Sequence, residues 1–281
     1  MSNLFWYCSL AVIGLVCIFF AMYKNENYVT FILFYIFTTS ITWFGEFVAL
    51  GIFSGYAYKP GVFTDPWAEN ILGHLILNST LWPGTAMLVA RYSLGYGWIL
   101  LITAVFILAE YLFVILGVYE QHWWRYYMSA IIVVSFQVIS KKWFIRMNQF
   151  RHGFTRHITF FFVAFLIMYS PNPLLLIAKM QFYRMGWVGN KYLDSSILTF
   201  IYYPLLCSIT VFFVCMLDKW YWKVVPLIIF IISDINLVNT NMLIFQHGWN
   251  LFYLAITHAL CLAAFITLEK HVLKPRLTTY E

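Results

Sequence analysis

Residues 98–116 read WILLITAVFILAEYLFVIL, and residues 222–240 read WKVVPLIIFIISDINLVNT. Each stretch begins with a tryptophan and places its single acid twelve residues later in a predominantly apolar run. Four landmarks recur in the same order at separations of 121, 124, 124 and 125 residues, namely Pro83, Trp98, Glu110 and Trp124, followed by Pro204, Trp222, Asp234 and Trp249. A recurrence this regular predicts a duplicated membrane unit.

The composition places the chain among the membrane proteins. Of its 281 residues, 63% are hydrophobic and 10% are charged, and the mean hydropathy is +0.79. A soluble domain carries roughly 25% charged residues. We therefore predict an all-α, polytopic membrane helix bundle of about nine spans, with one N-terminal helix and two parallel four-helix repeats. The expected spans are residues 4–23, 29–54, 70–90, 95–118, 124–140, 158–178, 192–217, 223–243 and 249–268.

The predicted domain organisation follows from these spans. It consists of an N-terminal transmembrane helix at 1–28, membrane repeat 1 at 29–143, a basic cytoplasmic linker at 144–157, membrane repeat 2 at 158–270 and a cytoplasmic tail at 271–281. Residues 170–173, Ser-Pro-Asn-Pro, interrupt the sixth span. Because proline removes a helical hydrogen-bond donor, this span is either a kinked continuous helix or two half-helices.

The basic residues predict the orientation. The nine-span arrangement places twelve of the 17 lysines and arginines on one side, and such an excess marks the cytoplasmic side. We expect a multi-pass protein of the cell membrane with its N-terminus outside and its C-terminus in the cytoplasm. Orientation on membrane lipid explains the net charge of +6, and nucleic acid is not expected as a partner. The five cysteines lie within apolar stretches, which predicts buried apolar residues rather than disulfides.

Polar side chains inside the spans are the candidates for function, because an ionisable group in hydrocarbon is costly unless it is paired or wetted. The predicted ligand-binding residues are Glu46, Asn70, His74, Asn78, Glu110, Asp234, Asn236, Asn239 and His258. We expect one water-accessible cavity that opens to the outside between the repeats. Its predicted lining is Glu46, His74, Glu110 and Asp234, with Asn78 and Asn239 on its wall.

Alternatives remain open for each part of this set. Asn70, His74 and Asn78 recur at i+4 on one helix face and either meet a ligand or hydrogen-bond neighbouring helices. Glu110 and Asp234 are equivalent in the two repeats, and they either share a site or find separate partners within their own repeats. No close-spaced pair of ligands predicts a metal site, and the sequence identifies no cofactor.

The second half resembles an uncharacterised family of small bacterial integral membrane proteins with four to five spans, through Tyr203, Pro204, Lys219, Lys223, Asp234 and Trp249. The first half resembles the same family through Tyr58, Pro60, Asn78, Pro83, Glu110 and Trp124. The chain therefore looks like a tandem version of that unit, with Asp234 where a glutamate is usual. The string FIISD at 230–234 also resembles the membrane domains of lycopene cyclases, but the Glu-Glu pair of those enzymes does not occur in this sequence.

Three functional classes fit these features. The first is transport or binding of a small molecule, ion or lipid at a polar site between the repeats. The second is a membrane-embedded enzyme acting on a lipid or isoprenoid, and convergence of Glu46, His74 and Glu110 in one pocket would favour it. The third is an accessory membrane subunit whose polar residues serve packing. Nucleotide chemistry is not expected, because the sequence has no Gly-rich phosphate loop.

Overall fold

The computed structural model describes residues 2–23, 28–148, 153–217 and 219–270, and it confirms the predicted all-α membrane helix bundle. The chain forms two compact units, Met1–Gln149 and Phe150–Glu281. Their boundary falls within the predicted linker, 144–157. Residues 149–152 of that linker, residues 24–27 of the predicted N-terminal segment and the predicted tail, 271–281, lie outside the described residues.

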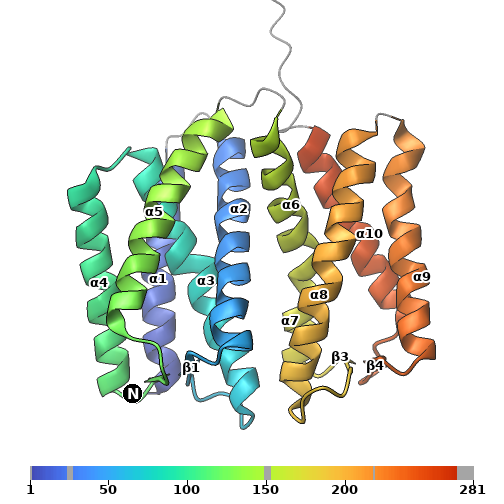
Figure 1. Cartoon of the computed structure of the whole chain (residues 1–281), viewed down its shortest axis with the longest axis horizontal. Coiled ribbons are helices and arrows are strands. Elements are labelled where there is room, and N and C mark those ends of the chain that lie inside the picture. Colours follow the sequence, from blue (N-terminus) through green and yellow to red (C-terminus); the bar gives the residue numbers. More distant parts are fainter. Residues whose placement is uncertain (1, 24–27, 149–152, 218, 271–281) are drawn as a thin grey trace, which may run out of the picture. The chain divides into compact units, whose positions relative to one another are not determined.

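Unit 1 contains five α-helices and a two-stranded ribbon within its described residues. The helices are α1 (Asn3–Met22), α2 (Tyr28–Glu46), α3 (Pro66–Arg91), α4 (Tyr96–Ile115) and α5 (Tyr126–Asn148). A π-helical turn, η1 (Phe47–Ile52), extends α2. The antiparallel ribbon pairs β1 (Tyr56–Tyr58) with β2 (Tyr119–Gln121), with Ala57 opposite Glu120. α1 begins at the end of unit 1 that carries β1 (Figure 1).

Within its described residues, unit 2 has the same order of elements as unit 1 from α2 to α5, without a counterpart of α1. Its described elements are α6 (Phe154–Tyr169), α7 (Pro171–Ile177), β3 (Gln181–Tyr183), α8 (Lys191–Val211), η2 (Phe212–Met216), η3 (Trp220–Val224), α9 (Val225–Asn239), β4 (Leu243–Phe245) and α10 (Leu251–Leu268). β3 and β4 form a second antiparallel ribbon. Figure 1 shows this ribbon at one end of the helices of unit 2.

Eight helical segments of the described chain are long and apolar enough to cross a membrane. They are Asn3–Met22, Tyr28–Ile52, Tyr96–Ile115, Tyr126–Met147, Phe154–Ile177, Lys191–Met216, Trp220–Asn239 and Leu251–Leu268. The segment predicted as the third span, 70–90, lies in α3, which is helical over 26 residues but is not among the eight. Asn70, His74 and Asn78 lower its apolar character. Because α3 packs against α1, α2 and α5, other helices shelter these polar groups from lipid.

Two glycines bring α1 and α3 into close contact. A Cβ atom on Gly14 would collide with the backbone of Thr80 and Leu81, and one on Gly84 would collide with the backbone oxygen of Gly14. Small residues allow this kind of close backbone approach between membrane helices. The packing of α1 on α3 therefore depends on both glycines.

The interruption predicted in the sixth span is confined to one residue. Ser170 separates α6 from α7, yet its backbone has helical dihedral angles, and its N–H donates to the Leu166 oxygen at 2.9 Å. Pro171 and Pro173 lie in the first turn of α7, where a proline removes no intrahelical hydrogen bond. Together α6 and α7 form one apolar segment of 24 residues, Phe154–Ile177, whose helical hydrogen bonding is interrupted between the two helices, where the two prolines lack an N–H group.

The same backbone hydrogen bonds hold the ribbon end of both units. The Lys59 N–H donates to the Val118 oxygen at 3.1 Å, and the Arg184 N–H donates to the Met242 oxygen at 2.7 Å. The loops before α3 and α8 also match. The Glu69 carboxylate accepts hydrogen bonds from three backbone N–H groups of its loop, and Asp194, 125 residues later, accepts four. Each residue from β1 to α3 therefore corresponds to the residue 125 positions later, between β3 and α8. Each residue of β2 corresponds to the residue 124 positions later, in β4.

Candidate functional site

A cavity of about 590 Å³ lies inside unit 1. Its walls come from α1, α2, α3, α4, α5, η1 and both strands of the ribbon, and the lining residues belong to unit 1. This volume falls within the range of about 300–1,000 Å³ that is typical of pockets for small molecules. The polar side chains in its wall include Thr42, Glu46, Asn78, Glu110 and Ser129.

Glu46 supplies one carboxylate to the cavity. It lies at the last position of α2 and is 9% exposed. Tyr56, Tyr58 and Asn78 surround this carboxyl group closely enough to interact with it electrostatically. The atom Oε1 is nevertheless buried without a hydrogen-bond partner in the described residues. A buried acceptor in this state is a candidate for a bond from a ligand, because leaving it unpaired costs about 1–3 kcal/mol.

The ribbon places tyrosine hydroxyl groups over the same cavity. Tyr56 and Tyr58 of β1 and Tyr119 of β2 line it, and all three are buried. Burial raises the pKa of Tyr56 and Tyr58 well above 10, and the charge of Glu46 raises it further. These hydroxyl groups therefore remain neutral and can donate hydrogen bonds at physiological pH.

Glu110 on α4 supplies the second carboxylate. The side-chain amide of Gln121 donates to Glu110 Oε1 at 2.7 Å, and Ser129 also interacts with the carboxylate. Trp124 holds Ser129 in place, because its indole N–H donates to the Ser129 hydroxyl at 2.7 Å. The polar partners of Glu110 thus come from β2 and α5, and all lie in its own unit.

The polar stripe on α3 divides into different roles. Asn70 anchors the ribbon, because its Oδ1 accepts the Tyr58 N–H at 2.7 Å. His74 does not line the cavity. Its Nδ1 lies 3.0 Å from Asn78 Nδ2, and its ring contacts Trp43 at 5.2 Å between centroids. Asn78 and Trp82 line the cavity.

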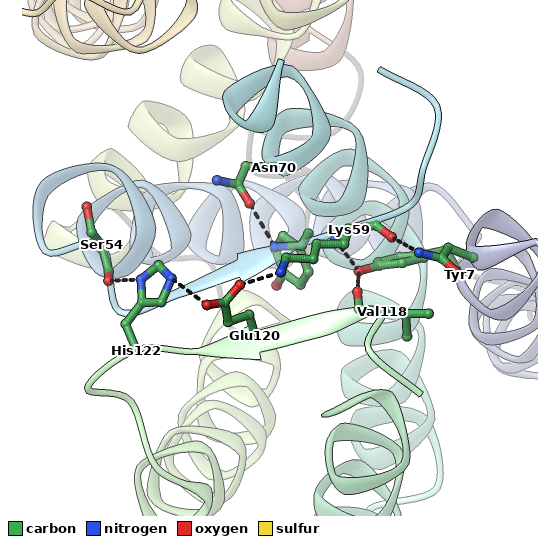
Figure 2. A network of polar contacts seen from close by, with 9 residues as sticks. Tyr7, Ser54, Lys59, Asn70, Val118, Glu120 and His122 are labelled. Atoms are coloured by element: carbon green, nitrogen blue, oxygen red, sulfur yellow. Dashed lines mark hydrogen bonds and ion pairs between the residues drawn. The ribbon is translucent and has the colours of Figure 1, made fainter. Parts of the chain in front are cut away.

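A polar network fixes the outer surface of the ribbon (Figure 2). Glu120 lies between Lys59, with which it forms an ion pair, and His122. The hydrogen bond and charge of Lys59 lower the pKa of Glu120 below its usual value. At the other end, Tyr7 of α1 donates to the Val118 oxygen at 2.6 Å and accepts the Lys59 N–H at 3.1 Å. The network therefore ties α1 to both strands above the cavity.

Unit 2 brings Asp234 and His258 together. His258 Nε2 lies 2.9 Å from Asp234 Oδ2, and the Tyr202 hydroxyl donates to Asp234 Oδ1 at 2.9 Å. Asp234 and His258 are buried, at 0% and 2% exposure. His258 packs against the rings of Phe230 and Tyr203, with centroids 4.8 and 6.4 Å apart. Like Glu110, Asp234 finds its hydrogen-bond partners within its own unit.

The remaining predicted residues occupy different surroundings. Asn236 and Asn239 lie at exposed positions of α9. The predicted convergence of Glu46, Glu110 and Asp234 on one cavity between the repeats stays a prediction, since the cavity described above is lined by unit 1. In the described part of the chain, no three His, Cys, Asp or Glu side chains come together as a metal site would require. All five cysteines are free.

Several residues of these sites were not predicted. Tyr56, Tyr58 and Tyr119 were missed as cavity residues because they lie in three-residue strands that leave no periodic signal. Tyr202 was missed because a tyrosine in an apolar helix is common at a membrane interface.

The eight apolar segments and the buried polar groups define a multi-pass helical membrane protein. No protein-family model, no curated protein and no solved structure matches the chain.

Proposed function

We propose that this membrane protein binds a small amphipathic organic molecule in the cavity of unit 1, as a carrier or transporter of that molecule. The observation that carries the proposal is the cavity itself. It is largely apolar and aromatic, and it contains two carboxylates, one of which has a buried oxygen without a hydrogen-bond partner among the described residues. Apolar walls bind the body of such a molecule, and the polar groups orient it.

The position of the cavity favours a molecule that partitions into the membrane. Phe53 and Trp123 line the cavity at the ribbon end and are also largely exposed, at 58% and 45%. Ile132 and Ile139 line it from α5 and are exposed on the side of that helix. These residues support two routes of access, one at the ribbon end and one lateral. In the orientation that we propose from the basic residues, with the N-terminus outside, the ribbon end faces the outside.

A transport or binding function has more support than an enzymatic function. A membrane-embedded enzyme would need a catalytic group within reach of the substrate, and the predicted histidine, His74, does not line the cavity. Unit 2 holds its acid and histidine in a buried hydrogen-bonded pair. We therefore also propose that the two units derive from an internal duplication and that the ligand binds in unit 1, whose cavity has the size of a small molecule.

Binding of matched probes tests the proposal. The purified protein in lipid nanodiscs is titrated with 4-phenylbutylamine, 4-phenylbutanol and 4-phenylbutyrate, which share one apolar body. Saturable quenching of tryptophan fluorescence is expected with the amine and the alcohol, because Trp82 and Trp124 line the cavity. The butyrate is expected to bind at least tenfold more weakly, since two carboxylates repel it.

The control variant is Ala109→Phe, which fills the cavity from α4. It is expected to abolish saturable quenching while the protein stays folded by far-UV circular dichroism. Equal quenching of the filled variant and the natural protein would mean that the probes report only on lipid partitioning, and the proposed function would be wrong.

A further inference from the structure

The two units surround equivalent acids with different side chains. Glu110 in α4 and Asp234 in α9 are separated by 124 residues. The turns that end these helices match at the same separation, because the Val118 N–H donates to the Phe113 oxygen at 3.0 Å and the Met242 N–H donates to the Leu237 oxygen at 2.8 Å. The acids therefore occupy the same place relative to the helix end and the ribbon.

The helices that face these acids also correspond. α5 begins at residue 126 and α10 at residue 251, a separation of 125. His258 on α10 therefore corresponds to Val133 on α5. By the same separation within α3 and α8, Tyr203 corresponds to Asn78. Val133 and Asn78 both line the cavity of unit 1. Their larger counterparts, His258 and Tyr203, are both buried beside Asp234.

His258 thus occupies, in unit 2, the position of a residue that lines the cavity in unit 1. The imidazole is a flat aromatic ring whose Nε2 is hydrogen-bonded to Asp234 at 2.9 Å. The ring contacts the ring of Phe230, with centroids 4.8 Å apart and the two planes tilted by 41°. The counterpart of Phe230 in α4 is Phe106, 124 residues earlier, and Phe106 lines the cavity near Glu110 in sequence.

We infer that the ligand of the unit 1 cavity is a small nitrogen heterocycle with an N–H group that hydrogen-bonds to Glu110 and a ring that lies beside Phe106. In unit 2 the His258 ring contacts Asp234 and Phe230, and we infer that the ligand ring contacts Glu110 and Phe106 in the same way. The inference rests on the proposed function of the cavity and adds the chemical class of its ligand.

The charges around the cavity agree with this class. Among the described residues that line it, none is a lysine, arginine or histidine, whereas Glu46 and Glu110 are both present. A ligand that donates an N–H group satisfies such a carboxylate, and a purely hydrocarbon ring leaves it unpaired. Before the ribbons the separation is 126, because the Gly55 N–H donates to the Ala49 oxygen and the Met180 N–H donates to the Leu175 oxygen. Glu46 therefore corresponds to Asn172, and unit 1 has a carboxylate where unit 2 has an amide. A second donor group on the ligand would bond to this carboxylate.

The first test uses 4-phenylimidazole and the matched hydrocarbon phenylcyclopentane on the natural protein in nanodiscs, followed by tryptophan fluorescence. We expect 4-phenylimidazole to bind at least tenfold more tightly. We expect Glu110→Gln to reduce its affinity at least tenfold, because the amide replaces the carboxylate. Val133→His is expected to abolish binding, since it introduces the ring that fills unit 2. Glu120→Gln, at an exposed position of the ribbon outside the cavity wall, is the control and should bind normally.

The second test uses unit 2 and needs no ligand of unit 1. His258→Ala removes the ring beside Asp234 and should lower the midpoint of thermal unfolding. Added imidazole should restore that midpoint saturably, and cyclopentanol should not. Double replacement by Asp234→Leu and His258→Ala should remove the effect of imidazole. If His258→Ala does not fold, the first test still decides the inference.

The outcomes separate the inference from the proposed function. Saturable binding of 4-phenylbutylamine together with equal affinities for 4-phenylimidazole and phenylcyclopentane would overturn the nitrogen heterocycle and leave the binding function intact. Saturable binding by none of the probes would overturn both. Retention of 4-phenylimidazole binding by a folded Val133→His variant would also overturn the inference, because the two rings could not share one place.

Discussion

Replacing Asp234 by leucine tests the internal partnership of unit 2. The carboxylate makes two hydrogen bonds of 2.9 Å, one with the Tyr202 hydroxyl and one with His258 Nε2. Asp234→Leu removes both bonds and leaves His258, which is 2% exposed, without its acid. A hydrogen bond to a charged group contributes about 1.5–3 kcal/mol, and removal of one partner of a buried pair costs about 3–5 kcal/mol.

We therefore expect Asp234→Leu to lower the free energy of unfolding by about 3–5 kcal/mol. Tyr202→Phe removes one bond only and should cost about 1 kcal/mol, close to the values of about 0.6–1.7 kcal/mol for hydrogen bonds between membrane helices. The assay is unfolding in mixed micelles at increasing mole fractions of dodecyl sulfate, followed by far-UV circular dichroism.

A double-mutant cycle isolates the pair. The double variant Asp234→Leu/His258→Leu should be less destabilised than the sum of the two single variants, with a coupling free energy of about 1.5–3 kcal/mol. Additive effects to within about 0.5 kcal/mol would refute the reasoning, since independent sites behave in that way.

Three further predictions concern the packing and the ribbon end. Gly84→Val should destabilise the protein by several times more than Gly97→Ala in the same detergent titration. A side chain on Gly84 meets the backbone of α1, whereas one on Gly97 meets open space. Equal effects would contradict the close approach of α1 and α3. The pKa of Glu120 is lowered in the folded state, so the ion pair with Lys59 stabilises the protein above pH 4.5 and is lost as the pH falls through the lowered value. Unfolding midpoints from pH 3 to 7 should show this small loss in the natural protein and not in Glu120→Gln, and identical profiles would contradict it. Asp194→Ala removes the acceptor of four backbone N–H groups, so hydrogen exchange in the loop before α8 should accelerate at least tenfold, and unchanged exchange would show that the loop is held in another way.

The helices were predictable from sequence, because long apolar segments leave a strong signal. α3 is the instructive case. Its polar stripe made it the weakest span in apolar character, and the same stripe supplies Asn70 to the ribbon and Asn78 to the cavity. Three of the predicted polar residues, Glu46, Asn78 and Glu110, do line one cavity.

The partners of these residues were less predictable. Asp234 and His258 lie on different helices, 24 residues apart, and no local motif links them. The sequence left open whether the acids meet partners in their own repeats, and the hydrogen bonds of Asp234 and Glu110 supply such partners.

The alignment of the two halves also depends on structure. Prolines are conspicuous in sequence, which is why Pro83 was matched with Pro204. The backbone hydrogen bonds instead give a separation of 125 within α3 and α8, which sets Pro204 against Ser79. Hydrogen bonds in the ribbon record this register, because each pairs two defined residues. Single landmark residues in apolar helices do not define the register between the two halves in this way.

The most direct test of the central claim is to locate a bound probe in the cavity of unit 1. The protein is crystallised with 4-(4-bromophenyl)butylamine, and the bromine is found by its anomalous scattering. The account predicts bromine among the apolar side chains of the cavity and the amine within hydrogen-bond distance of Glu46 or Glu110. Bromine found only on the outer surface of the helices, with the cavity closed by its own side chains, would contradict the account.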